Sequence, residues 1–212
     1  MGRLETKLKK QPVWVDRALQ GVAYWMGHRN CLYREYPLSE GALVAEVCNL
    51  IYANLPEAFQ LLCEVQYSGF VESNPMPAIL RGRTRADLVV AERPARREAD
   101  PIPKFIIEVK RASARTSQIN ADLSRLAAVR GICPGIRAFM FLISEAERPK
   151  RFVNGEGHSI LGTHHIPNSD GHYRVRRTWK AAHAFTRRDR AQYACLIEVY
   201  SAPRKVKARH AR

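Results

Sequence analysis

The sequence lacks long apolar runs and paired cysteines, and these absences exclude several classes of protein. No stretch of the 212 residues approaches the roughly 20 apolar residues of a membrane-spanning helix. No apolar run of the signal-peptide type follows the basic N-terminal residues, so we do not expect secretion. The five cysteines include no Cys-x-x-Cys pair, which argues against a disulfide framework or a zinc knuckle. Cys48, Cys63 and Cys195 lie in apolar runs and are predicted to be buried free thiols. We therefore expect a cytoplasmic protein without a membrane partner.

Basic residues are also missing from one long segment. No lysine or arginine falls between Glu35 and Leu80, although the chain has 35 Lys and Arg, 20 Asp and Glu and a net charge of +15. The basic excess lies in 81–115, 147–190 and 201–212, as expected for a nucleic-acid-binding face plus a basic arm. Ordinary solvated loops are the alternative. Arginine dominates, however, and its planar group suits phosphate contacts. We expect DNA as partner, with RNA left open, and nucleoid association if the protein is bacterial. The predicted contacts are Arg81, Arg83, Arg85, Arg111, Arg115, Arg174, Arg176 and Arg177.

Apolar periodicity predicts one α/β domain built around a mixed sheet. The predicted helices cover 12–26, 40–54 after an N-cap at Ser39, and 116–130 before Gly131, with a short helix over 179–185. The predicted strands cover 59–67, 85–92, 104–112, 136–143 and 192–200. The strand over 136–143 is apolar enough to be buried on both faces.

The predicted organisation has three parts. Residues 1–38 form an N-terminal helical extension, 39–200 form the main domain, and 201–212 form a basic disordered tail. The first helix either packs on the core or provides a dimer surface.

One set of charged residues lies on the predicted strands and carries a chemical signal. Glu108 and Lys110 are two apart in a strand, so both side chains point to one face, while Asp87 lies on the preceding strand. If these strands are neighbours, two carboxylates and one ammonium group converge. Carboxylates in this arrangement suit Mg²⁺, which would activate a water for phosphodiester hydrolysis. A surface ion pair of little energetic value is the alternative.

These residues, in this order of elements, resemble the PD-(D/E)xK nuclease superfamily over residues 39–144. The resemblance implies a restriction-endonuclease-like αβββαβ core, with a central mixed β-sheet flanked by helices. It implies that Asp87 and Glu108 bind Mg²⁺, for which Mn²⁺ can substitute, and that Lys110 is the catalytic lysine. Many members also carry a helix glutamate that reaches the metal, and Glu46 stands in the matching place; a half-exposed helix residue is the alternative. The sequence departs from the motif at Ala86, where the superfamily often has proline.

Two further residues have weaker signals. Gln118 either touches the site or a phosphate, or is an ordinary first-turn residue of the helix after Lys110. Some exonuclease-like members carry a tyrosine four residues after such a glutamine, but here that place holds Asp122. Glu64 either supports the site from behind or is an outward residue of a half-buried strand, and the second interpretation is favoured.

Together these patterns predict a metal-dependent nuclease, most plausibly a DNA endonuclease. A non-catalytic nucleic-acid-binding module or a structural subunit on the same fold is the alternative. A homodimer is expected only by analogy, since two sites would then meet two strands. Sequence specificity stays open, because base contacts depend on loops that the pattern does not place. Exonuclease activity and the biological pathway stay open as well.

Overall fold

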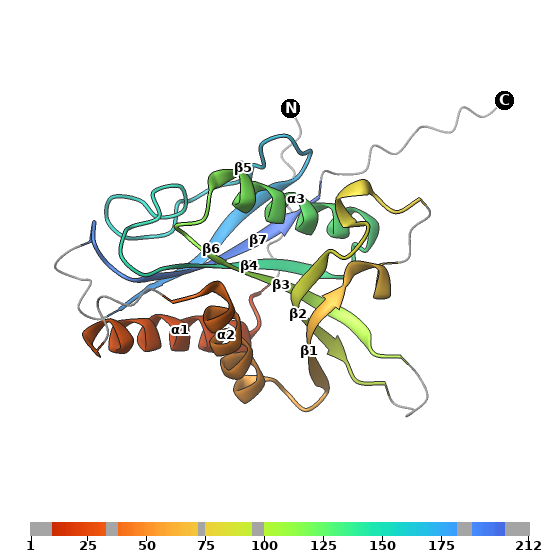
Figure 1. The fold of residues 1–212 in the computed structure, drawn as a ribbon, viewed down its shortest axis with the longest axis horizontal. Coiled ribbons are helices and arrows are strands. Elements are labelled where there is room, and N and C mark those ends of the chain that lie inside the picture. The colour runs from red at the N-terminus through yellow and green to blue at the C-terminus, as the bar shows by residue number, and fades with distance from the viewer. Residues whose placement is uncertain (1–9, 33–37, 72–74, 95–99, 182–187, 202–212) are drawn as a thin grey trace.

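A computed structural model describes residues 10–32, 38–71, 75–94, 100–181 and 188–201. Helices α1 and α2 cover one face of a seven-stranded sheet, and helix α3 covers the other (Figure 1). The helices are α1 (Val13–Leu32), α2 (Glu40–Asn54) and α3 (Thr116–Ile132), with 3-10 turns η1 (Tyr67–Gly69) and η2 (Ala78–Leu80). The strands are β1 (Phe59–Gln66), β2 (Arg85–Glu92), β3 (Ile102–Arg111), β4 (Arg137–Ser144), β5 (His164–His165), β6 (His172–Lys180) and β7 (Tyr193–Tyr200).

The sheet is mixed because of one crossover. Its strand order is β1-β2-β3-β4-β7-β6-β5, and the pair β3–β4 is parallel whereas the other neighbours are antiparallel. A parallel pair needs a long connection, and α3 provides it across one face of the sheet. The predicted α/β class and mixed sheet are therefore confirmed, and the order helix, three strands, helix, strand runs from α2 to β4.

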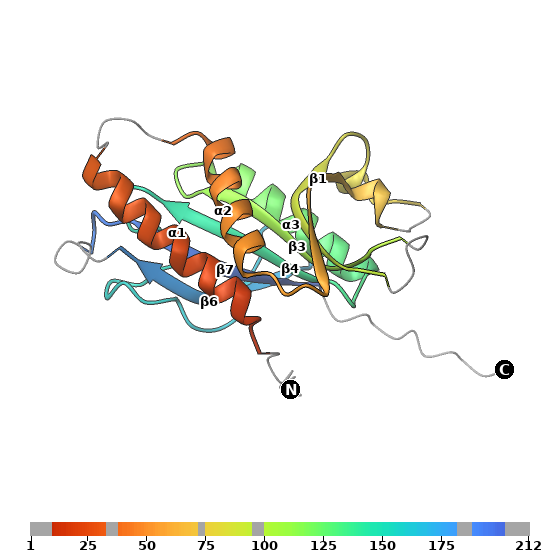
Figure 2. The ribbon, with the colours of Figure 1, turned by 90° about the horizontal axis from the view of Figure 1, so that it is seen from below.

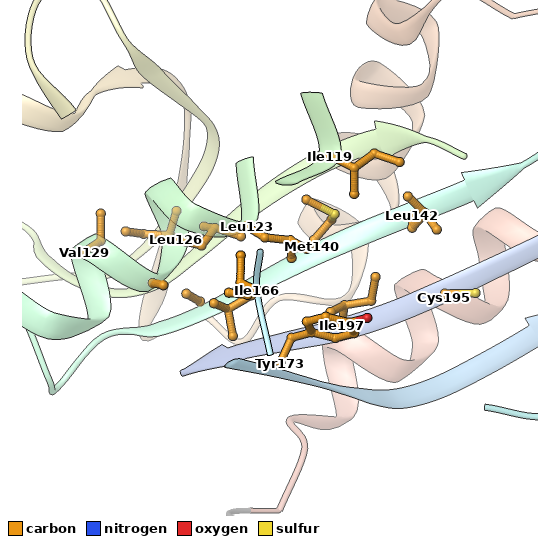
Figure 3. Close-up of a cluster of buried hydrophobic side chains, with 14 of the residues drawn as sticks. Ile119, Leu123, Leu126, Val129, Met140, Leu142, Ile166, Tyr173, Cys195 and Ile197 are labelled. Carbon is orange, nitrogen blue, oxygen red and sulfur yellow. The ribbon is translucent and has the colours of Figure 1, made fainter. Parts of the chain in front are cut away.

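The core has one layer on each side of the sheet. Figure 3 shows the α3 side, where Leu123 and Leu126 of the helix lie against Met140 of β4 and Ile197 of β7. The opposite layer joins α1 and α2 to the other face of the same strands, and its fully buried members include Leu19, Leu43, Phe139 and Leu196. Burying one such side chain contributes about 1.5–3 kcal/mol. Strand β4 supplies residues to both layers, as its apolar sequence predicts.

Helix α1 packs on the core. Its inner side chains Val15, Leu19 and Val22 are buried in the same cluster as residues of α2 and the sheet, and Figure 2 shows α1 and α2 over that face. Trp14 is 5% exposed and meets Phe105 of β3 edge-on, with ring centroids 5.2 Å apart. The core-packing alternative for this helix is thus the correct one. The division at residue 38 stays a prediction, and 202–212 of the predicted tail lie outside the described residues.

Local signals set the start of α2. The Ser39 side chain accepts a hydrogen bond from the Ala42 backbone N–H, as expected of an N-cap serine. Leu43, Val47 and Ile51 follow at helical spacing and are buried. This start positions Glu40 in the first turn, near the end of β3.

Three sequence predictions were wrong. The segment 179–185 is not a short helix where it is described, because Trp179 and Lys180 continue β6; residues 182–187 lie outside the described part. Strand β6 carries several arginines and has a register shift between Val175 and Arg177. The shift interrupts the alternation of apolar and polar residues by which a strand is predicted from sequence. Helix α3 runs through Gly131 to Ile132. Of the cysteines, Cys195 is buried as predicted, Cys48 is half-buried and Cys63 is exposed.

None of the described helices has the length and apolar content that crossing a membrane requires.

Candidate active site

The adjacent strands β2 and β3 bring the predicted carboxylates together. Leu88 pairs with Ile107 in the antiparallel register, which puts Asp87 directly across from Glu108. A backbone hydrogen bond fixes Asp87, because the Val109 N–H donates to its Oδ2 at 2.7 Å. The sheet therefore holds the two carboxyl groups side by side on the α3 face.

Glu108 is the most deeply buried acid of this pair, with 3% of its surface exposed. Its Oε1 accepts a hydrogen bond from the hydroxyl of Tyr67, a buried residue that begins η1 directly after β1. Burial, and after it the negative charge of Asp87, raises the pKa of Glu108 to about 8, although the Tyr67 hydrogen bond lowers it. Burial also raises the pKa of Asp87 above its usual value, against the lowering effect of the Val109 N–H. Each carboxyl group is thus costly to ionise in the folded protein.

Lys110 lies two residues further along β3, where it is held by two carboxylates from different helices. Its Nζ is 2.7 Å from Oε1 of Glu40 on α2 and 3.1 Å from Oδ2 of Asp122 on α3. Asp122 is 3% exposed and also pairs with Arg125 one turn later. The lysine side chain is 15% exposed, so its ammonium group sits in a defined place at the border of the two helices.

The carboxyl pair fits a divalent cation by its chemistry. The negative charge of Asp87 raises the pKa of Glu108, and a cation between the two carboxyl groups would offset that repulsion. Both supply oxygen ligands, and Mg²⁺ commonly takes only one or two carboxylates while keeping several waters. No group of three or more His, Cys, Asp or Glu side chains that could hold a metal ion is found in the described part of the chain. The pair would therefore have to complete its coordination with water or a phosphate oxygen.

Glu64 extends the row of carboxylates onto β1. Cys63 pairs with Leu88 and Val65 pairs with Ala86, so Glu64 stands across from Asp87, and its charge contributes to raising the pKa of Asp87. Its φ of 53° lies in a region that non-glycine residues seldom adopt. The Glu64 side chain is exposed, in line with the outward position favoured from sequence.

Two other predicted residues lie on the helices. Glu46 is half-buried on α2, six residues after Glu40, which is about 9 Å along a helix axis. Lys110 pairs with Glu40 of this helix. That Glu46 reaches a metal ion stays a prediction. Gln118 acts within the first turn of α3, since its Oε1 accepts from the Arg115 N–H at 3.2 Å.

The predicted arginines fall into two separate groups. Arg81, Arg83, Arg85 and Arg115 are exposed around the start of β2 and the start of α3. Arg111 ends β3 and pairs with Glu145 at 3.0 Å.

The second group lies on β6, three strand spacings from β3, or roughly 14 Å across the sheet. There Arg176 is 3.2 Å from Glu198, and Arg177 is 3.3 Å from Asp16 of α1. Arg174 donates to the Thr163 hydroxyl. The first group therefore lies on or directly beside the strands that carry Asp87 and Glu108, whereas the β6 group lies on a distant strand.

Sequence reasoning did not assign site roles to Tyr67, Glu40, Asp122 or Arg125. Asp122 had a usable signal, because it lies three residues after Ile119 and four before Leu126, both on the buried stripe of α3. A carboxylate on such a stripe needs a partner. The other three have no comparable signal in the sequence, since their roles depend on contacts between distant elements.

No family model, curated protein or solved structure matches this chain.

Proposed function

We propose that the protein is a metal-dependent nuclease that hydrolyses phosphodiester bonds of DNA, as an endonuclease. The observation that carries this proposal is the placement of Asp87 across from Glu108, with Lys110 two residues further along the same strand. The resemblance to the PD-(D/E)xK superfamily motivates the same assignment. Nucleic-acid binding is supported by the net charge of +15 and by the exposed arginines next to β2 and α3.

Asp87 and Glu108 would hold the Mg²⁺ or Mn²⁺ ion. When bound, such an ion lowers the pKa of a coordinated water and neutralises charge that develops on the phosphate. The carboxyl pair itself would repel a phosphate, so DNA binding at this place requires a compensating cation. Release of the proton from Glu108, whose pKa is raised to about 8, would accompany ion binding.

Lys110 would act on the reacting phosphate or its attacking water. Its ammonium group provides positive charge and hydrogen-bond donors, while Glu40 and Asp122 fix its position. Prearranged donors of this kind stabilise developing charge without reorganisation during the reaction. Glu40 and Asp122 are therefore positioning residues in this proposal.

One observation favours a second candidate, a nucleic-acid-binding module that does not cut. Lys110 is already paired with two carboxylates, so its charge is largely balanced before any phosphate arrives. A protein that only binds DNA would use the exposed arginines and leave this charge cluster as a structural element.

Plasmid cleavage separates the two candidates. Purified protein is incubated with supercoiled DNA, linear DNA and RNA, in Mg²⁺, in Mn²⁺ or in EDTA. The nuclease proposal expects nicking or linearisation with either metal and none in EDTA, with Asp87→Asn and Lys110→Ala inactive. Lys104→Ala is the matched control, since Lys104 is a partly exposed lysine near the other end of β3, paired with Glu92 at 2.7 Å. Absence of metal-dependent cleavage, or equal cutting by Lys110→Ala, would favour the binding module.

A further inference from the structure

Two cysteines from different elements meet on the α2 side of the sheet. The Sγ atoms of Cys48 on α2 and Cys63 on β1 are 3.4 Å apart, within the range of a hydrogen bond between thiols. A disulfide bond measures about 2.05 Å, so the two sulfur atoms need to approach each other by only about 1.4 Å. The pair is therefore placed for a covalent bond that small side-chain rotations can complete.

The strand pattern of β1 explains why Cys63 faces α2. Phe59 and Leu61 lie at alternate positions before it and pack against the core cluster beneath α1 and α2, as Cys48 does. Side chains two apart in a strand share a face, so Cys63 continues this row toward the helix. The thiol contact thus joins the middle of α2 to the middle of β1.

The two thiols differ in exposure. Cys63 is exposed, whereas Cys48 is half-buried. An oxidant that arrives from solvent would therefore meet Cys63 first, and Cys48 lies in contact with it. An accessible cysteine beside a second cysteine that can resolve its oxidised form is the usual arrangement of a redox-sensitive thiol pair.

The state of the Cys63 thiol sets the speed of such a reaction. Partial burial, and after it the hydrogen bond and the charge of Cys48, raises the pKa of Cys63 to about 11. The protonated thiol therefore dominates at neutral pH, and oxidation is slow because the thiolate is the reactive form. The pair suits sustained exposure to an oxidant and not a rapid signal.

We propose that Cys48 and Cys63 form a reversible disulfide when the protein meets a peroxide. One oxygen of hydrogen peroxide is transferred to the Cys63 sulfur as the O–O bond breaks, which leaves a sulfenic acid and one water. The Cys48 sulfur then displaces the hydroxyl group, which takes the Cys48 proton and leaves as a second water. Two thiols are oxidised and one peroxide is reduced to two waters. A dithiol reductant reverses the bond by thiol–disulfide exchange.

The disulfide would fix an edge of the sheet. In the described sheet β1 is an edge strand that pairs with β2, and all of its residues are half-buried or exposed. A segment with few buried apolar contacts opens locally more readily than the centre of a core. A bond to α2 across a separation of 15 residues restricts this opening and the unfolded chain. In reducing compartments disulfides are usually transient and redox-sensing, so here the oxidation state would control the stability of this edge.

Peptide mapping by mass spectrometry can locate the bond, because no lysine or arginine falls between Glu35 and Leu80. Trypsin therefore leaves both cysteines in the single peptide 35–81, which holds no other cysteine. We expect this peptide to lose two hydrogen atoms after treatment with hydrogen peroxide and to regain them with dithiothreitol. Further cleavage after Glu57 should give two fragments that stay joined only in the oxidised sample.

Thermal unfolding and amide hydrogen exchange, both in EDTA, measure the effect of the bond. The oxidised wild type should melt roughly 6–12 °C above the reduced protein, and its amides over 59–66 should exchange more slowly. Cys48→Ser and Cys63→Ser should lose both responses. Cys133→Ser, at the C-cap of α3, is the matched control and should respond like the wild type. Melting of the reduced variants checks that each is folded.

Three results would overturn the proposal. The first is a peptide 35–81 that keeps its hydrogen atoms or gains oxygen atoms under peroxide. The second is a Cys63 linked to a peptide that carries another cysteine. The third is a Cys48–Cys63 bond that changes neither the melting temperature nor the exchange of β1. These measurements involve no DNA and no metal ion, so their outcome is independent of the proposed nuclease activity.

Discussion

Replacing Glu108 with glutamine should remove a pH-dependent source of instability from the folded protein. The carboxyl group is 3% exposed, beside Asp87, and its pKa is raised to about 8 from 4.5, chiefly by burial. Between these two pH values the folded chain keeps a proton on Glu108 that the unfolded chain has released. The free energy of unfolding therefore falls as pH rises through that interval. Glutamine has nearly the same shape, and its Oε1 can still accept the hydrogen bond from Tyr67.

The magnitude follows from the same interval. From 4.5 to about 8, at about 1.4 kcal/mol for each pH unit, the wild-type protein loses at most roughly 5 kcal/mol of unfolding free energy through this group. Below pH 4.5 the wild type and Glu108→Gln should be similarly stable, since both side chains are neutral. Above pH 8 the variant should be more stable by several kcal/mol.

Urea unfolding of both proteins across this pH range, in EDTA, measures the difference. Repeating the series in Mg²⁺ adds a second test, because an ion bound at the Asp87–Glu108 pair, as proposed, would stabilise the folded state by about 2.7 kcal/mol at a hundred times its Kd. We expect that gain for the wild type at high pH and its absence in Glu108→Gln. If the difference in unfolding free energy between the wild type and Glu108→Gln stays constant with pH, Glu108 is not a buried acid with a raised pKa, and this conclusion does not depend on the result in Mg²⁺.

Three other substitutions test the contacts around this site and the core. Glu40→Gln should reduce plasmid cleavage about tenfold. It should cost little stability, about 1 kcal/mol or less, since the Glu40 side chain is 43% exposed and Lys110 keeps Asp122 as a partner. Glu46→Gln should cut normally, and the reverse order would assign the helix carboxylate to Glu46. Asp122→Asn should lower the free energy of unfolding by about 3 kcal/mol, because it breaks a buried charge cluster, and an unchanged urea midpoint would contradict the burial. Gly171→Ala should cost about 1–3 kcal/mol, because its Cβ would lie 2.5 Å from the Cβ of Ala127, and equal melting temperatures would contradict that packing.

Much of the fold could be predicted because its signals are local. The strand over 85–92 has the predicted bounds, and the Ser39 cap starts α2 at Glu40. The inner stripe of α1 also follows its helical period, from Val15 to Met26. In each case the side chains that set the pattern are neighbours in sequence, so periodicity and capping suffice to find them.

Of the candidate site, only the residues on strands β2 and β3 could be predicted from the sequence. Asp87 and Glu108 face each other because their strands are neighbours, which the sequence suggested but did not show. The sequence singled out Glu46 as the helix glutamate of the site and gave no sign that Glu40 pairs with Lys110, since that contact depends on how α2 sits over the end of β3. The arginines of β6 were grouped with those near β2 by composition alone. Strand order separates them, and ion pairs with Glu198 and Asp16 occupy two of them.

The central claim is that Asp87 and Glu108 together bind a catalytic divalent cation. Crystals soaked with Mn²⁺ and measured at the manganese absorption edge test it most directly. We expect an anomalous peak between the Asp87 and Glu108 carboxylates, lost in Asp87→Asn crystals soaked in the same way. Anomalous density elsewhere only, or an undisturbed carboxyl pair at saturating Mn²⁺, would contradict it.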